Sequence, residues 1–355
     1  MKSLGNFPDP FAQEIAGQPD ALRRAAAGLA DQRDALGRLF EISSRSTPIF
    51  TGMGSSYDAC YPAVTELARA GRAVVHVGAA ELLHFRMRIL DRTSLVVAVS
   101  QSGESAEVVR LARALPEADR PTVVAITNGT QSALASLADL VLDTRAGEET
   151  GPSTMTFAAS LVALAGVAAT LVGTPGPEAA SQLVDDAEAA ASMLDRLLAD
   201  RSLPQELADW LGPRDSIVLL ARGPARAAAE MGALTLKEAV GMPAESLEAA
   251  QFRHGPLELA GPDLAAIVFA TEPETAELDL ALGAELVAAG AAVLVVTRDA
   301  VAFAGATQIE IGPLTRTIAP AVSILPVQIL AWQLAILRGR VPGAYVRASK
   351  VTTHE

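Results

Sequence analysis

The sequence predicts an α/β fold with two tandem doubly wound domains, each built on a parallel sheet. Three observations predict it: the length of 355 residues, the alternation of β-branched apolar runs with helical stretches, and the return of that alternation in the second half. Single cores usually stop growing below about 300 residues, so the length favours two domains. Strands that alternate with helices predict βαβ units and a parallel, flavodoxin-like sheet covered on both faces.

The strand pattern of the first half recurs in the second. Four apolar runs are interpreted as strands with their turns, at 47–56, 94–105, 122–129 and 139–144. Similar runs begin 169 residues later, at 216–225, 263–274, 291–299 and 308–313. Four strands in step indicate a duplicated domain. We expect a helical segment at 1–34, a first domain at 35–175, a helical connector at 176–209, a second domain at 210–340 and a tail at 341–355.

Charge and composition narrow the class of partner. The chain has 28 Lys and Arg against 41 Asp and Glu, a formal net charge of −13. Such a surface repels nucleic-acid backbones and anionic lipid, so neither nucleic acid nor membrane is an expected partner. The first nine residues lack a basic stretch followed by an apolar run. We therefore expect no signal peptide and a cytoplasmic location.

The cysteine content argues against a disulfide-bonded or zinc-binding protein, and two apolar stretches argue against a membrane-spanning one. Cys60 is the only cysteine, so neither an internal disulfide nor a cysteine-held zinc is expected, and no metal or cofactor is implied. The apolar stretches 157–173 and 317–337 are interpreted as buried or interface helices. The first is short for a membrane span, and the second contains Pro320 and Pro326.

Two Gly/Ser turns follow neighbouring predicted strands, "GMGSS" at 52–56 and "SQSGES" at 100–105. Ligands of parallel sheets bind beyond the carboxyl ends of the strands, where helix N-termini favour anions. The glycines permit close backbone approach and the serines offer hydroxyl donors, which predicts a phosphate site. The alternative is that these serines only cap helices. The corresponding turns of the second half, "ARGPA" and "ATEPE", lack this chemistry. The predicted phosphate-site residues are Gly54, Ser55, Ser56, Ser100, Ser102, Gly103 and Ser105.

These motifs resemble the sugar isomerase (SIS) family. The similar branch is the double-SIS one, which includes the isomerase half of glutamine–fructose-6-phosphate amidotransferase, stand-alone glucosamine-6-phosphate deaminases of the second type, and fructosamine deglycases. The resemblance covers nearly the whole chain. Besides the two turns it rests on "EIAGQPDALRR" (14–24), "GEETGPSTMTF" (147–157), "LTLKEAVGMPAESLEAAQFRHGPLEL" (234–259) and "ASKVTTHE" (348–355).

The resemblance implies a role for each matching residue. Glu238 is the base that moves a proton between C1 and C2 of the sugar. His254 opens the sugar ring and reaches the site from the partner subunit of a homodimer with shared active sites. Lys350 closes over the substrate with the C-terminal tail, while Glu149 and Ser153 lie near it. The residues implied to hold the phosphate are Ser56, Ser100, Gln101, Ser102 and Ser105.

The residues themselves leave alternatives open. A carboxylate suits proton removal beside a carbonyl or imine, but a surface charge is the default for a Glu such as Glu238. For His254, proton exchange and a hydrogen-bonded structural imidazole are equally expected. Lys350 alone would be interpreted as a solvated terminal lysine, so its role rests on the resemblance.

Departures from the family pattern shape the functional expectation. The chain starts Met1–Lys2, without the catalytic Cys of a glutaminase domain, and Thr235 and Met155 or Thr156 stand where family members carry Lys. We expect an amino-sugar-phosphate deaminase/isomerase with a glucosamine 6-phosphate-like substrate, which transfers a proton between C1 and C2 and releases ammonia. The enzyme alternatives are a fructosamine-phosphate deglycase and an aldose–ketose phosphosugar isomerase. A non-catalytic phosphosugar-binding sensor is the alternative outside enzymes.

Overall fold

The chain forms two compact units. The computed structural model describes residues 9–43 and 46–354. Unit 1 groups Met1–Pro19, Glu149–Thr154 and Ala189–Val346, and unit 2 groups Asp20–Glu148, Met155–Glu188 and Arg347–Glu355. Each unit is therefore assembled from three separate stretches. The domain boundaries expected from the sequence remain predictions.

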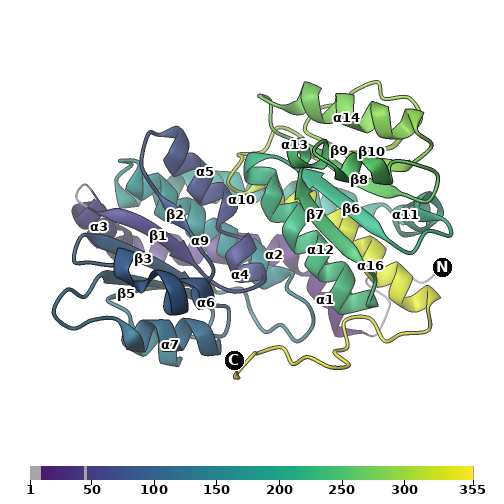
Figure 1. Ribbon diagram of the computed structural model, residues 1–355. Coiled ribbons are helices and arrows are strands. Elements are labelled where there is room, and N and C mark those ends of the chain that lie inside the picture. The colour runs from purple at the N-terminus through teal and green to yellow at the C-terminus, as the bar shows by residue number, and fades with distance from the viewer. Residues whose placement is uncertain (1–8, 44–45, 355) are drawn as a thin grey trace. The chain divides into compact units, whose positions relative to one another are not determined.

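Unit 2 contains a parallel five-stranded sheet in the order β2-β1-β3-β4-β5 (Figure 1). Thr47 pairs with Ser94, and Leu95 with Thr122, so the strands run in close register. Its strands are β1 (Thr47–Thr51), β2 (Val75–His76), β3 (Ser94–Val99), β4 (Thr122–Thr127) and β5 (Leu140–Asp143). This is the flavodoxin-like order, in which strands are added on one side of β1 as far as β2 and on the other side from β3 onward, so that the strand order reverses between β1 and β3.

Helices cover both faces of the unit 2 sheet. Ile49, Val96 and Val123 pack under one set of helices, which contributes Val108 and Leu134 to the same core. That set is α6 (Ala79–Glu81), α7 (Ala106–Ala114) and α8 (Ala133–Leu137), with a π-helical turn at Leu82–Arg86 and a 3-10 turn at Met87–Ile89. The remaining helices of this half are α2 (Gln18–Asp31), α3 (Arg33–Ser43), α4 (Ser55–Asp58), α5 (Tyr61–Arg69), α9 (Met155–Leu171) and α10 (Gly176–Ala199).

Unit 1 repeats the topology. Its parallel sheet has the order β10-β9-β8-β6-β7, which is the same 2-1-3-4-5 pattern. The strands are β6 (Ile217–Ala221), β7 (Ala244–Glu248), β8 (Ala265–Ala270), β9 (Ala292–Thr297) and β10 (Thr307–Glu310). The two predicted tandem doubly wound sheets are therefore confirmed. The spacing differs from the constant 169: β1 and β6 begin 170 residues apart, and β5 and β10 begin 167 apart, because the loops differ in length.

Helices also cover both faces of the unit 1 sheet (Figure 1). Phe252, Leu282 and Leu286 pack on one face, against Val218 and the strands beside it. The elements that contribute to this face are α13 (Ala249–Phe252), a 3-10 turn at Pro256–Leu259 and α14 (Ala276–Ala288). The other elements are α1 (Pro10–Ala16), α11 (Leu203–Leu211), a 3-10 turn at Gly223–Ala225, α12 (Arg226–Val240), α15 (Ala319–Ser323) and α16 (Leu325–Leu337).

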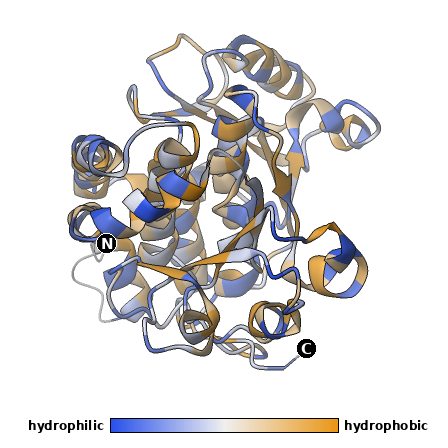
Figure 2. Cartoon of the chain, turned by 90° about the vertical axis from the view of Figure 1, so that its left-hand side faces the viewer, coloured by the Kyte–Doolittle hydropathy of each residue, from blue (hydrophilic) through white to orange (hydrophobic). Residues whose placement is uncertain are grey.

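The apolar stretches are core helices of their own units. α9 packs against α3 and α5, and α16 packs against α11 and α12. The stretch Ala319–Leu337 is long and apolar enough to cross a membrane, but 89% of it is buried inside the structure. Most residues of both helices are buried within their own units, which fits the interpretation as buried helices. In Figure 2 the strands are mostly hydrophobic, whereas many helices carry both hydrophobic and hydrophilic residues.

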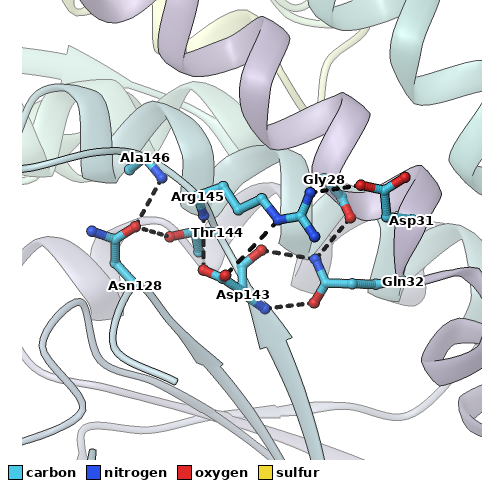
Figure 3. A network of polar contacts seen from close by, with 8 residues as sticks. All are labelled: Gly28, Asp31, Gln32, Asn128, Asp143, Thr144, Arg145 and Ala146. Atoms are coloured by element: carbon cyan, nitrogen blue, oxygen red, sulfur yellow. Dashed lines mark hydrogen bonds and ion pairs between the residues drawn. The ribbon is translucent and has the colours of Figure 1, made fainter. Parts of the chain in front are cut away.

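A polar network fixes the chain where it leaves β5 (Figure 3). The Gln32 side chain accepts a hydrogen bond from the Asp143 N–H (2.7 Å) and donates one to the Asp143 carbonyl (3.0 Å). Arg145, whose φ of 50° is unusual for a residue with a side chain, pairs with Asp31 at 2.7 Å. Asn128 accepts a hydrogen bond from the Ala146 N–H (2.8 Å). The loop that leads to the predicted substrate-proximal segment 149–154 is thus held at its start.

Candidate functional site

The two Gly/Ser turns lie at the topological switch point of the unit 2 sheet. "GMGSS" follows β1 and "SQSGES" follows β3, and these two strands are direct neighbours. In doubly wound sheets, ligands bind beyond the carboxyl ends of two such neighbouring strands, at the point where the strand order reverses. The structure therefore brings the predicted phosphate-site residues of both turns into one unit, at one sheet edge.

The first turn is shaped by close backbone packing. Gly54 has a φ of 52°, a conformation that favours glycine. A Cβ on Gly52 would lie 3.0 Å from the Tyr57 backbone nitrogen and from the Val99 carbonyl oxygen, so any side chain would displace backbone. Ser56 is buried and Ser55 is half-buried at the start of α4. The two glycines thus let β1 turn sharply into a helix that presents both serines.

The second turn is held by hydroxyl groups. The hydroxyls of Ser100 and Ser105 are 3.0 Å apart, and the Ser100 hydroxyl also accepts from the Gly103 N–H at 3.2 Å. Ser102 accepts from the Glu104 N–H at 3.1 Å. Ser105 occupies the N-cap position of α7, yet its side chain makes no capping hydrogen bond. Helix capping therefore does not explain Ser105, whose hydroxyl lies within hydrogen-bond distance of the Ser100 hydroxyl instead.

Gln101 contributes to this turn through its backbone. Its carbonyl accepts hydrogen bonds from the Asn128 N–H at 2.9 Å and from the Thr127 hydroxyl at 3.3 Å. These bonds tie the turn after β3 to the end of β4. The Gln101 side chain is half-buried, and the bonds to the neighbouring strand fix its backbone.

The C-terminal tail lies against the start of α7. The carbonyl of Thr352 accepts a hydrogen bond of 3.1 Å from the N–H of Ala106, the first residue of that helix. Lys350, two residues earlier, is half-buried and belongs to the same unit as the serine turns. The tail that carries Lys350 is thus next to the second turn.

The remaining predicted residues belong to unit 1. Glu238 is half-buried near the end of α12, which stops at Gly241 in the left-handed conformation (φ 64°). Lys237 is exposed. Thr235 is fully buried, and its hydroxyl donates to the Met231 carbonyl of its own helix at 2.9 Å. The position where family members carry Lys therefore presents no free donor.

His254 and the segment 149–154 also lie in unit 1. His254 is exposed after α13, and its backbone N–H donates to the Gln251 carbonyl at 2.9 Å. Within the described residues no hydrogen bond of its ring is found. Glu149 is buried and accepts hydrogen bonds from the N–H (2.8 Å) and hydroxyl (3.0 Å) of Thr154, beside half-buried Ser153.

Tyr345 is a neighbour of Glu238 that the sequence analysis missed. It is half-buried in the segment that follows α16. Burial raises the pKa of its phenol, and the carboxylates of Glu238, Glu149 and Glu14 raise it further. A lone tyrosine in a loop carries no sequence signal, and only the fold brings it to these carboxylates.

In unit 1, paired charged side chains of the protein lie at the switch point of the sheet. Arg222, at the end of β6, pairs with Asp279 of α14 and lies 3.3 Å from Glu248 at the end of β7. Asp279 is 1% exposed, and its burial raises its pKa to about 6 although Arg222 opposes the rise. The buried carboxylate of Asp279 thus lies at the carboxyl ends of the unit 1 strands, the place that the serine turns take in unit 2.

The raised pKa predicts how Asp279 affects stability. Because the folded chain binds this proton more tightly than the unfolded chain does, the contribution is complete below about pH 4 and is lost as the pH rises through about 6. The unfolding free energy of the wild type relative to Asp279→Asn should fall by about 2–3 kcal/mol from pH 4 to 7. Urea unfolding of both proteins at each pH measures it. A pH-independent difference would show that Asp279 titrates normally.

Clusters of metal ligands do not contribute to the candidate site. In the part of the chain that the structure describes, no group of three or more His, Cys, Asp or Glu side chains could hold a metal ion. Cys60 is fully buried, which raises the pKa of its thiol, and its thiol donates to the Ser56 carbonyl.

Fold and site together define a two-domain α/β protein whose first sheet carries a hydroxyl-lined switch point. Two segments of the chain, 41–169 and 211–338, match the family model described as SIS domain. The chain therefore belongs to the SIS domain family, with two such domains in tandem. The matched segments contain both Gly/Ser turns as well as Glu238 and His254, while the tail with Lys350 lies beyond them.

Individual relatives point the same way. The chain is 31% identical over 361 residues to a glutamine–fructose-6-phosphate aminotransferase [isomerizing] of Pyrobaculum aerophilum, with 100% of this chain and 59% of the relative covered. The Mycolicibacterium paratuberculosis relative of the same name is 33% identical, with 94% and 56% covered. The chain thus spans less than two thirds of the length of these relatives.

Solved structures extend the likeness. The C-terminal domain of glucosamine-fructose-6-phosphate aminotransferase from Francisella tularensis superposes with a TM-score of 0.85 at 25% identity, covering 96% of this chain and 99% of that one. Tagatose-6-phosphate ketose/aldose isomerase from Escherichia coli gives 0.79 at 22% identity, with 95% of each chain covered, a likeness of fold alone. These comparisons support the expected class, an enzyme of the SIS type.

Proposed function

We propose that this chain is a phosphosugar enzyme that deaminates and isomerises an amino-sugar phosphate resembling glucosamine 6-phosphate. The observation that carries this is the hydroxyl cluster of Ser100 and Ser105 at the switch point of the first sheet, where Ser105 makes no capping bond. Hydroxyl donors at the start of a helix suit a phosphate, which leaves the sugar end of the substrate for the chemistry. The matching relatives bear names of sugar-phosphate enzymes, which favours this substrate class.

We assign each chemical step to one of the residues that match the family pattern. His254 opens the sugar ring, and Glu238 removes the proton from C2 of the open-chain aldose and returns it to C1. The aldose amine becomes a ketose imine, and water then adds and expels ammonia. Lys350, on the tail beside the second turn, closes over the substrate, and Glu149 and Ser153 line it. Phosphate anchoring contributes by fixing the orientation of the reacting carbons.

A substrate panel tests this function. The protein is incubated with hexosamine 6-phosphates, fructosamine 6-phosphates and ketohexose 6-phosphates, and the release of ammonia or amine and the appearance of aldose are measured. Ammonia release from glucosamine 6-phosphate is the expected result. Activity only on a fructosamine phosphate would establish the deglycase instead, and aldose–ketose interconversion without ammonia would establish a plain isomerase. Binding of sugar phosphates without turnover would indicate a sensor.

The proposed enzyme acts in the cytoplasm as a homodimer with shared active sites. The exposure of His254 suits a residue that serves a second copy of the chain. Sedimentation tests the assembly, since a stable monomer with full activity would exclude a site completed by a partner's histidine. The net charge of −13 keeps nucleic acid and anionic lipid outside the expected partners.

A further inference from the structure

The second serine turn contains an acidic residue that phosphate binding does not explain. In "SQSGES", Glu104 lies between Gly103 and Ser105, and a carboxylate there repels the anion that the turn is proposed to hold. Its side chain is exposed and accepts a hydrogen bond of 2.7 Å from the N–H of Ala133, the first residue of α8. The carboxylate is therefore bonded to the helix that follows β4.

Backbone hydrogen bonds hold the same turn against the segment after β4. The Gln101 carbonyl accepts from the Asn128 N–H at 2.9 Å. The Gly103 carbonyl accepts from the N–H of Leu134, the second residue of α8, at 3.0 Å. The carboxylate of Glu104 adds a charge-assisted bond to this set, a class that is shorter and stronger than neutral hydrogen bonds. The second half of the turn is thus fixed to the start of α8.

The hydroxyls of the turn lie on both sides of Glu104 in the chain. Ser105 follows it directly, and the Ser105 hydroxyl is 3.0 Å from that of Ser100. Ser102 lies two residues before it, and the Ser102 hydroxyl accepts from the Glu104 N–H at 3.1 Å. A turn that is already held in one conformation loses less entropy when it binds a ligand. The bond of Glu104 therefore helps to place three of the predicted phosphate-site hydroxyls.

We propose that Glu104 is a positioning residue of the phosphate site, which acts through its hydrogen bond to Ala133 and not through its charge. The role rests on the proposed function, because it concerns the same serine turn. The acceptor oxygen of Glu104 orders the turn, while its negative charge opposes the phosphate. These two contributions to phosphate affinity have opposite signs, so substitutions that keep or remove the acceptor separate them. All of the groups involved belong to unit 2.

Two substitutions of Glu104 test the role by calorimetry with glucosamine 6-phosphate and with inorganic phosphate. Glu104→Gln keeps an oxygen acceptor for the Ala133 N–H and removes the charge, whereas Glu104→Ala removes both. Glu104→Ala should bind both probes about tenfold more weakly than the wild type. Glu104→Gln should bind them equally or up to about threefold more tightly, because one repulsive charge is gone. Glu117→Ala, which removes an exposed glutamate from the loop after α7, should leave both affinities unchanged.

The binding results separate this inference from the proposed function. Wild-type affinity in Glu104→Ala, or equal weakening in Glu104→Ala and Glu104→Gln, would overturn the positioning role. In the first case the bond would be immaterial to binding, and in the second the charge would decide it. A wild type that binds the probes but turns over nothing in the substrate panel overturns the proposed enzyme alone, and one that binds neither probe overturns both.

Amide hydrogen exchange reads the bond itself without any ligand. The Ala133 N–H should exchange about tenfold faster in Glu104→Ala than in the wild type, because its acceptor is gone, and at nearly the wild-type rate in Glu104→Gln. With a substrate that the wild type turns over, KM of Glu104→Ala should rise about tenfold while kcat changes less than about threefold, since phosphate anchoring acts alike on ground and transition states. Equal exchange of the Ala133 N–H in all three proteins would overturn the role.

Discussion

Glu238→Gln is expected to lower kcat by about 10²- to 10⁴-fold while the affinity for the sugar phosphate stays close to that of the wild type. The amide keeps the size of the side chain and its half-buried place on α12, but it cannot accept a proton. Binding energy comes mainly from the phosphate, which we assign to the serine turns. The mutation therefore removes an interaction made only in the transition state.

Steady-state rates and ligand binding by calorimetry separate these two effects for Glu238→Gln. Solvent deuterium incorporation at C1 or C2 reports proton transfer itself and should disappear as well. Lys237→Gln is the matched control, because Lys237 is the adjacent, exposed residue of the same helix. Its kcat should be unchanged. A Glu238→Gln protein that retains deuterium exchange at the wild-type rate would exclude this carboxylate as the base.

Gly103→Ala is expected to damage both folding and phosphate binding. Gly103 has a φ of 68°, which costs about 1–2 kcal/mol for a residue with a Cβ. The added methyl would also collide with the Ser132 side chain and lie 3.1 Å from the Thr127 hydroxyl. The turn would have to move, and with it the Ser100 hydroxyl that bonds the Gly103 N–H. We expect a total loss of about 2–4 kcal/mol in unfolding free energy and at least a tenfold weaker affinity for sugar phosphate.

Urea unfolding and ligand titration measure the two consequences of Gly103→Ala. Gly37→Ala in α3 is the control, since a Cβ there meets no atom within 4 Å and alanine favours the helix. Its stability should be equal or slightly higher, with unchanged affinity. Wild-type affinity in a destabilised Gly103→Ala protein would place the phosphate somewhere other than this turn.

Strands that are buried on both faces could be predicted from the sequence. Runs such as 95–99 are continuously apolar and rich in valine, and the return of such runs in the second half predicted the duplication and the fold class. β2 and β7 were missed for the opposite reason. β2 has only two residues, β7 reads AESLE with two charges, and both are partly exposed edge strands. Pairing with β1 and β6, which is non-local, makes them strands.

Some residues of the candidate site could likewise be predicted from their neighbours in the sequence, and others could not. The Gly/Ser turns were recognisable because local chemistry is written in adjacent residues: positive-φ glycines and hydroxyls follow a buried strand. Glu238, His254 and Lys350 could be singled out only through the family resemblance, since each is an ordinary surface residue by its neighbours in the chain. Tyr345 carried no signal at all, because its environment is built from carboxylates some 100 to 330 residues away in sequence.

By itself, the sequence determined the two parallel sheets and the edge of the first sheet that carries hydroxyls, because hydrophobic periodicity and turn residues act over a few neighbouring positions. The tertiary structure alone decided that Ser105 bonds to Ser100 instead of capping its helix, and that Asp279 pairs with Arg222 at the switch point of the second sheet. These depend on contacts between distant segments, where packing and burial, not local preference, set the energy.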